Sequence, residues 1–142
     1  MKLLVKLEHP EAQLPKKATD GSAGFDLVAV SEKIDLVDRY VEYSFGLSVA
    51  IPEGHVGLIF PRSSISKKDI SLANAVGVID EDFRGILTAR FKNLILAGAR
   101  KYKVGERIAQ LVILKLPEVI VEAADELPVT ERGTGGWGST GV

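Results

Sequence analysis

Three acidic residues stand together near the middle of the chain, in the segment Gly77–Gly85 (GVIDEDFRG). Apolar residues and glycines flank them, which is typical of paired strands rather than of a solvated run of charges. Alternation along a strand would place Val78 and Asp80 on one face and Ile79 on the other. A carboxylate held on the inner side of a hairpin could take a proton from water as a general base. A polar turn is the competing interpretation, because acidic residues favour turns.

The composition indicates one globular domain of 142 residues. Apolar residues make up 46% and charged residues 26%, and a net charge of −1 gives no polycationic surface for nucleic acid. The chain has no cysteine and only two histidines, His9 and His55, which excludes thiolate chemistry and makes a zinc site or a Ser-His-Asp triad hard to build. No signal sequence and no apolar stretch of ~20 residues is present, so we expect a soluble cytoplasmic protein without a membrane partner.

Short apolar runs with a period of two predict an all-β protein, a jelly-roll-like barrel or sandwich. Prolines and other turn residues mostly stand at the ends of these runs. The single helix that we expect begins near Arg62 and runs through Lys68, with a serine as a possible cap. The runs that we expect to form strands are 3–7, 47–51, 56–60, 87–91, 109–113 and 119–123.

The C-terminal segment 132–142 (RGTGGWGSTGV) holds five of the fourteen glycines. Such a segment cannot build a core of its own, so it is either a frayed end or a mobile piece that closes over a ligand. The arginine, tryptophan and hydroxyl side chains among its glycines favour closure. We therefore divide the chain into a β domain, 1–131, and a mobile C-terminal lid, 132–142.

Five short motifs resemble those of the trimeric dUTP pyrophosphatases (dUTPases), in the order found in that family. The resemblance implies a jelly-roll-like fold, a homotrimer with shared active sites, and hydrolysis of dUTP to dUMP and pyrophosphate with Mg²⁺. In that family the reaction keeps uracil out of DNA and supplies dUMP for thymidylate synthesis. The motifs are 23–27 (AGFDL), 61–64 (PRSS), 77–85, 105–111 (GERIAQL) and 132–141.

The resemblance assigns the reacting water and the phosphates to two of these motifs. Asp80 would activate water against the α phosphorus, while Arg62 and Ser63, with Ser64 beside them, would bind the phosphate chain. An arginine fork suits phosphate oxygens, and a hydroxyl can donate to them. The competing interpretations are an ion pair between Asp80 and Arg84, and simple helix capping by the serines.

Two further residues are assigned by resemblance to the phosphates and the metal. Gln110, an amide within an apolar strand, would contact the phosphates or metal-bound water; the alternative is a strand residue that faces outward. Asp26 would help to hold the water shell of the metal, or it is a structural acid. The sequence holds no evident metal cage, which fits an Mg²⁺ ion that stays on the substrate phosphates.

The resemblance places base and sugar recognition on the central hairpin. Asn74 and the backbone at Gly77 and Val78 would read the uracil edge. Phe83 would stack on the deoxyribose, where the family usually has tyrosine. Trp137, in place of the usual phenylalanine, would stack over uracil, or else it is a packed core residue.

The rest of the tail would close over the phosphates. Arg132 would reach the γ phosphate, and Gly138, Ser139 and Thr140 would offer backbone and hydroxyl donors. Three alternatives remain: a dCTP deaminase of the same fold, a nucleotide-binding regulatory protein, and a β-rich interaction module. The deaminase is disfavoured because the strand 86–91 (ILTARF) lacks the glutamate that deamination uses.

Overall fold

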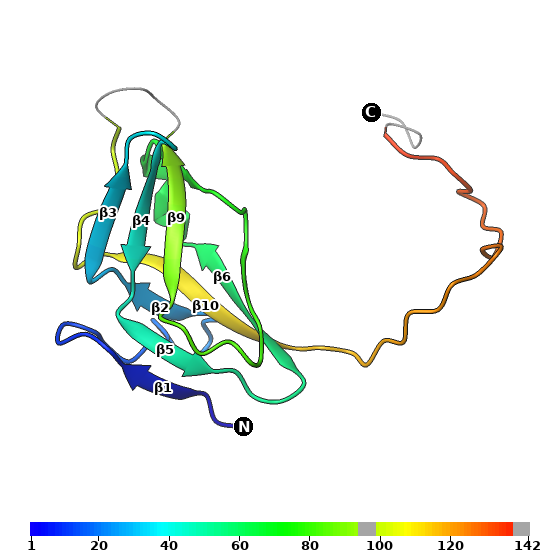
Figure 1. Cartoon of the computed structure of the whole chain (residues 1–142), viewed down its shortest axis with the longest axis horizontal. Coiled ribbons are helices and arrows are strands. Elements are labelled where there is room, and N and C mark those ends of the chain that lie inside the picture. The colour runs from blue at the N-terminus through cyan, green and yellow to red at the C-terminus, as the bar shows by residue number, and fades with distance from the viewer. Residues whose placement is uncertain (94–98, 138–142) are drawn as a thin grey trace.

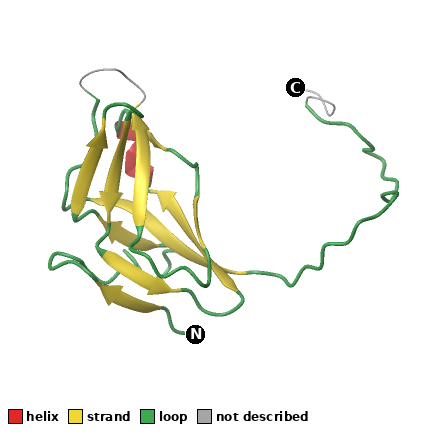
Figure 2. Cartoon of the chain, viewed as in Figure 1, coloured by secondary structure: helices red, strands yellow, loops and turns green. Residues whose placement is uncertain are grey.

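A computed structural model of the chain describes residues 1–93 and 99–137, which form antiparallel strands with one short 3₁₀ helix (Figure 1, Figure 2). The helix, η1, covers Ser63–Lys67. The strands are β1 (Leu4–Leu7), β2 (Phe25–Val28), β3 (Ser31–Asp35), β4 (Tyr40–Ser44), β5 (Leu47–Ala50), β6 (His55–Pro61), β7 (Ile70–Leu72), β8 (Gly77–Ile79), β9 (Thr88–Asn93) and β10 (Arg107–Lys115).

The described strands form two four-stranded sheets and one two-stranded sheet. The strand orders are β2-β10-β6-β8, β3-β4-β9-β7 and β1-β5, and every pairing is antiparallel. The described strands do not close into a barrel, and their arrangement is jelly-roll-like. The predicted all-β fold class is therefore confirmed.

The core between the sheets is built around three aromatic side chains. Tyr43 and Phe91 meet edge to face with ring centroids 5.8 Å apart, and Phe91 meets Tyr102 at 6.1 Å. All three are almost fully buried. The Tyr43 hydroxyl donates to the Tyr102 carbonyl oxygen at 2.8 Å, which satisfies a polar group that would be costly to bury alone. Burial raises the pKa of the Tyr43 phenol well above its usual value.

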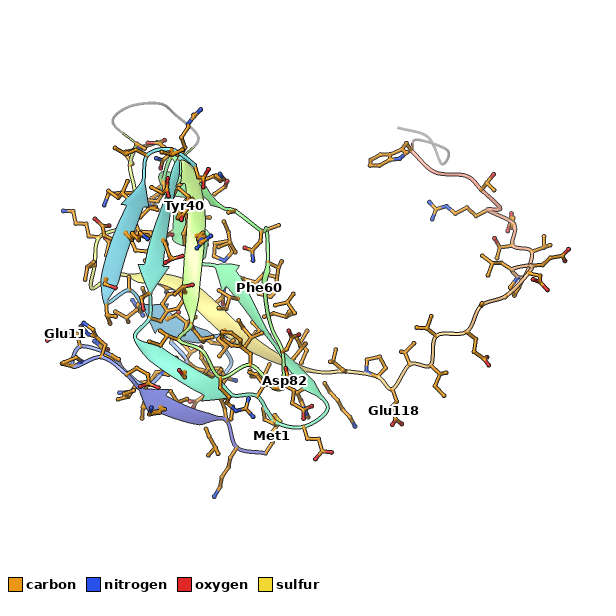
Figure 3. The ribbon with its side chains drawn as sticks, viewed as in Figure 1. Met1, Glu11, Tyr40, Phe60, Asp82 and Glu118 are labelled. Atoms are coloured by element: carbon orange, nitrogen blue, oxygen red, sulfur yellow. The ribbon has the colours of Figure 1, made fainter. Side chains whose placement is uncertain are left out.

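Five of the six predicted runs contain strands, namely β1, β5, β6, β9 and β10. The sixth, 119–123, was predicted wrongly, because the chain forms no strand after Lys115 in its described part. Residues 116–137 leave the sheets in an extended course, and Figure 3 shows Glu118 out on this segment. Ile120 and Val121 are 89% and 91% exposed, and the alternating pattern pairs with no strand in the described part of the chain.

The helix lies where the sequence predicts it, in the 3₁₀ form. Its N-cap residue is Arg62, and no side chain caps it, so the predicted serine cap is wrong. The Ser66 hydroxyl instead donates to the Ser63 carbonyl oxygen at 2.9 Å. None of the helices in the described part of the chain is long and apolar enough to cross a membrane.

An ion pair joins the end of this helical turn to the segment that leads into β10. Both carboxylate oxygens of Asp69 accept from the Arg100 guanidinium at 2.9 Å, and Asp69 also accepts from the Arg100 backbone amide. These hydrogen bonds lower the pKa of Asp69 from 3.8 to about 2. A lowered pKa in the folded state means that this pair stabilises the fold above the unfolded pKa and loses its effect as the pH falls toward 2.

Replacing Asp69 by asparagine should therefore lower the melting temperature near neutral pH, because the charged pair is lost. The difference from the wild type should be constant above about pH 5 and shrink as the pH falls through the interval between the two pKa values. Thermal unfolding of both proteins from pH 7 to pH 2 measures this difference, with Asp125→Asn on the extended segment as the control. A difference that stays constant down to pH 2 would contradict the assignment.

Candidate functional site

Four of the five motifs belong to the strands of the sheet β2-β10-β6-β8 or directly follow them. Asp26 lies in β2, Gln110 lies in β10, Arg62 directly follows β6, and Asp80 directly follows β8. In the register of the sheet, Gln110 is opposite Asp26 on one side and opposite Phe60 on the other. Residues directly opposite each other share a face of the sheet, so Asp26 and Gln110 present their side chains side by side.

The centre of this face is a carboxylate between two arginines. Asp26 Oδ1 lies 2.9 Å from Arg62 Nε, and Asp26 Oδ2 lies 3.0 Å from Arg107 Nη1. The Asp26 side chain is only 13% exposed, which makes each hydrogen bond to it stronger than on an open surface. The carboxylate orients both guanidinium groups while leaving further N–H donors of each free to bind an anion.

A β-bulge brings Arg107 to this face. The pairing of β10 with β2 shifts between Arg107 and Ala109, so that Arg107 stands opposite Val28. Val28 and Asp26 share a face, and without the shift Arg107 would point to the other side of the sheet from Gln110. Arg107 is a site residue to which the sequence analysis gave no role. The sequence pattern does not reveal a bulge, and the only available signal was its place within the motif 105–111.

Gln110 is held against the backbone of the first two motifs. Its side-chain amide donates to the Pro61 carbonyl oxygen at 3.3 Å, so it is partly buried and not simply an outward-facing strand residue. A Cβ atom added at Gly24 would lie 2.7 Å from Gln110 Oε1 and 3.0 Å from its Cβ. Glycine at position 24 is thus required by close approach, a second feature that the sequence analysis did not single out.

The two serines after Arg62 have different surroundings. Ser63 is exposed beside the arginine. Ser64 shares a hydrogen bond of 2.9 Å with the hydroxyl of the buried Tyr102, which ties the helical turn to the core. The hydroxyl of Ser64 is thereby engaged within the protein, whereas that of Ser63 faces solvent.

A hollow of about 380 Å³ opens between β8 and β9. Its lining includes Asn74, Gly77 and Val78, three of the residues predicted to read a base. The rest of the lining consists of Thr88, Ala89 and Arg90 of β9 together with Glu42, Ile59, Leu72, Ala73 and Ile79. β8 and β9 belong to different sheets, so the hollow lies between these two sheets.

Asp80 opens the turn that follows β8. Its carbonyl oxygen accepts from the Phe83 amide at 3.2 Å, and its side chain is exposed. The predicted alternative of an ion pair with Arg84 is not found in the described part of the chain: the Arg84 guanidinium donates to the carbonyl oxygens of Glu81 and Phe83. The Asp80 carboxylate therefore remains available to accept a proton.

The same turn fixes Phe83. A Cβ atom added at Gly85 would lie 2.6 Å from the tip of the Phe83 ring, so the ring covers this glycine. The ring is 41% exposed and presents a face to solvent. At the other side of the turn, the Glu81 carboxylate accepts from the Gly54 amide at 2.8 Å, which ties the turn to the start of β6.

One chain does not bring Asp80 and Arg62 together. Ile79 pairs with Gly57 near the start of β6, whereas Arg62 follows its last residue. At about 3.3 Å per residue, the two side chains are separated by roughly 20 Å along the strand. In Figure 3, Asp82, in the turn after β8, lies near the start of β6, and Phe60 lies toward the end of that strand.

The predicted tail residues stand apart from both groups. Arg132 and Trp137 are exposed on the extended segment, and the alternative of a packed core tryptophan is contradicted by its full exposure. Gly138, Ser139 and Thr140 lie outside the described residues.

The described residues include no group of three His, Cys, Asp or Glu side chains that could hold a metal ion. Among the predicted ligands, Asp26 has both oxygens engaged by arginines. This donor set fits a cation held through water and ligand oxygens, and not a cage made of protein side chains.

Comparison with known proteins gives one consistent family. The family model described as dUTPase matches residues 10–141. A deoxyuridine 5'-triphosphate nucleotidohydrolase of a Hydrogenobaculum species is 41% identical, with 100% of this chain and 99% of that protein covered. A protein of the same name from Rhodococcus erythropolis is 37% identical, with coverage of 99% and 87%. A solved structure of a mutant dUTPase of Staphylococcus bacteriophage 80alpha with dUpNHpp has a TM-score of 0.84 at 28% identity, covering 99% of both chains.

Proposed function

The chain belongs to the dUTPase family, and we propose that it hydrolyses dUTP to dUMP and pyrophosphate through water activated by Asp80. The supporting observation is that the sheet β2-β10-β6-β8 carries Asp26, Arg62 and Gln110 on one face and ends in a free Asp80 carboxylate beside a hollow. This arrangement offers an anion site, a base and a nucleobase pocket. Those are the parts that hydrolysis of a nucleoside triphosphate requires.

The chemical step is an attack of water on the α phosphorus. Asp80 takes a proton from the water, the new P–O bond forms, and the bond from the α phosphorus to the bridging oxygen breaks. The electron pair leaves with pyrophosphate, and dUMP remains. The surroundings of Asp80 support this role, because its side chain is exposed and has no ion pair in the described part of the chain.

The phosphates would lie on the arginine face of the sheet. Arg62, which Asp26 orients, would donate to phosphate oxygens, as would the exposed hydroxyl of Ser63. Gln110 of β10 would contact the phosphates as well. Ser64 would act mainly by holding this turn, because its hydroxyl is engaged by Tyr102. Preorganised donors of this kind stabilise charge that develops on the leaving group.

We assign Mg²⁺ to the substrate phosphates. When bound, the ion neutralises charge on the phosphate oxygens. Asp26 and Gln110, which are adjacent in the register, would hold it through its water shell.

The hollow between β8 and β9 would take the base and the sugar. Asn74 and the backbone at Gly77 and Val78 would read the uracil edge, and Phe83 at the neighbouring turn would stack on the deoxyribose. The ring keeps the apolar face that excludes a 2′-hydroxyl even though it lacks the phenolic oxygen usual in the family.

The complete site would be shared between copies of the chain. Asp80 and Arg62 are roughly 20 Å apart along β6, which is too far for both to act on one α phosphate. A homotrimer in which Asp80 of one chain meets Arg62 of another solves this problem. Segment 132–142 of the third chain would then close over the ligand as a lid. Arg132 would bind the γ phosphate and Trp137 would stack over uracil. Gly138, Ser139 and Thr140 would donate hydrogen bonds to the phosphates.

Changing Asp80 to asparagine should lower kcat about 10²–10⁴-fold, because the amide cannot take the proton from water. Binding of a non-hydrolysable dUTP analogue, followed by the fluorescence of the single tryptophan Trp137, should be unchanged. Asp82→Asn, two residues along the same turn, is the matched control and should retain activity. Loss of analogue binding in Asp80→Asn would show that Asp80 is structural.

Mixing two inactive variants tests the shared site. Asp80→Asn and Arg62→Ala chains, refolded together in equal amounts, should recover about one quarter of the wild-type activity, because each residue comes from an intact chain half of the time. The same variants refolded separately and then combined without subunit exchange are the control. No recovery in the co-refolded sample would show that both residues must come from one chain.

Deleting 132–142 should lower kcat/KM at least about tenfold without changing the melting temperature, because the closing segment is lost while its described residues, 132–137, lie outside the core. Steady-state rates and thermal unfolding of the shortened chain measure the two effects. A shortened chain with the full rate would rule out the lid.

A further inference from the structure

A basic recess lies between η1 and the segment that leads into β10. It has a volume of about 480 Å³ and is lined by Arg62, Ser64, Lys67, Lys68, Tyr102, Gly105, Glu106 and Arg107. Four of these eight residues carry a positive charge and one carries a negative charge. We call it the basic recess below. In a chain whose net charge is −1, this is a marked local concentration of cations.

Three of the four cations are held in place by neighbouring groups. Arg62 and Arg107 are oriented by Asp26. The Lys68 ammonium donates to the Lys101 carbonyl oxygen at 3.2 Å and lies 4.7 Å from the centre of the Tyr102 ring. Such fixed cations need little reorganisation to receive an anion.

The carboxylates nearby do not cancel this charge. Glu106 accepts from the Lys103 amide at 2.7 Å and lies 3.7 Å from Lys68, a long ion pair. Asp26 is shared by two arginines. Lys67, at the end of η1, has no ion pair with any carboxylate in the part of the chain that the structure describes. With two carboxylates against four cations, the recess keeps a net positive charge.

We propose that the basic recess binds the leaving pyrophosphate. In this proposal Lys67 binds the product and makes no contact with the bound substrate. The inference rests on the proposed function, because Arg62 belongs both to the phosphate site and to the wall of the recess. After cleavage the anion gains charge, and it can turn about Arg62 toward Lys67 and Lys68 without first entering bulk water. A lysine ammonium group binds such oxygens as a compact point charge with three N–H donors.

The test is calorimetric titration of the full-length protein with inorganic pyrophosphate. Lys67→Gln should weaken pyrophosphate binding about ten- to hundredfold, the worth of one hydrogen bond to a charged group. Lys115→Gln, at the opposite end of β10, is the matched control and should bind as the wild type does. Equal binding by Lys67→Gln and the wild type, or displacement by an equal concentration of sulfate, would overturn the proposal.

Kinetics separates a product site from a substrate site. Lys67→Gln should leave the KM for dUTP within about twofold of the wild type while weakening product inhibition by pyrophosphate about tenfold or more. A parallel rise in KM would overturn the proposal by placing Lys67 in the substrate site. A protein that binds pyrophosphate through Lys67 yet fails to hydrolyse dUTP would contradict the proposed function and leave the recess as an anion site.

Discussion

The pairing of β10 with β6 is the constraint on which the rest of the site depends. The two strands pair over seven successive residues, from Ala109 opposite Pro61 to Lys115 opposite His55. Because side chains alternate with a period of two, a slip of one residue would move Gln110 to the other face of the sheet and away from Arg62. The buried side chains of Ile59 and Leu111 oppose such a slip, since they would be turned outward. Core packing thus fixes the register, and the register fixes the anion site.

The same sheet also contains a β-bulge, in the pairing of β10 with β2. A regular β10 would point Arg107 away from Asp26, and the bulge between Arg107 and Ala109 corrects this. The result is a partly buried carboxylate shared by two guanidinium groups. Removing Asp26 would leave the positive charges of Arg62 and Arg107 close together without a carboxylate between them. Asp26 therefore positions the two arginines, whether or not it also contacts the water shell of a metal ion. The two arginines also line the basic recess, together with Lys67 and Lys68.

Much of the fold could be predicted from the sequence because alternation is a direct consequence of strand geometry. The run at 109–113 predicts β10, and the polar Gln110 within it indicates a site. Other features depend on partners that no local pattern reveals. The run at 119–123 alternates as well as β10 does but pairs with no strand among residues 1–93 and 99–137. The sequence motif predicts that Ser64 binds phosphate. The structure shows that its hydroxyl shares a hydrogen bond with Tyr102, a residue distant in the sequence. The separation of Asp80 from Arg62 follows only from the strand register.

The most direct test of the account is pyrophosphate release from dUTP, dCTP, dTTP and UTP measured in parallel, with Mg²⁺ and with a chelator, while ammonia is monitored. The account predicts Mg²⁺-dependent release from dUTP alone, because the hollow between β8 and β9 would read uracil and Phe83 would exclude the ribose hydroxyl. Release of ammonia from dCTP would contradict it and indicate deamination on the same fold. Absence of any product from all four nucleotides would contradict it as well and leave a protein that binds nucleotides without hydrolysing them.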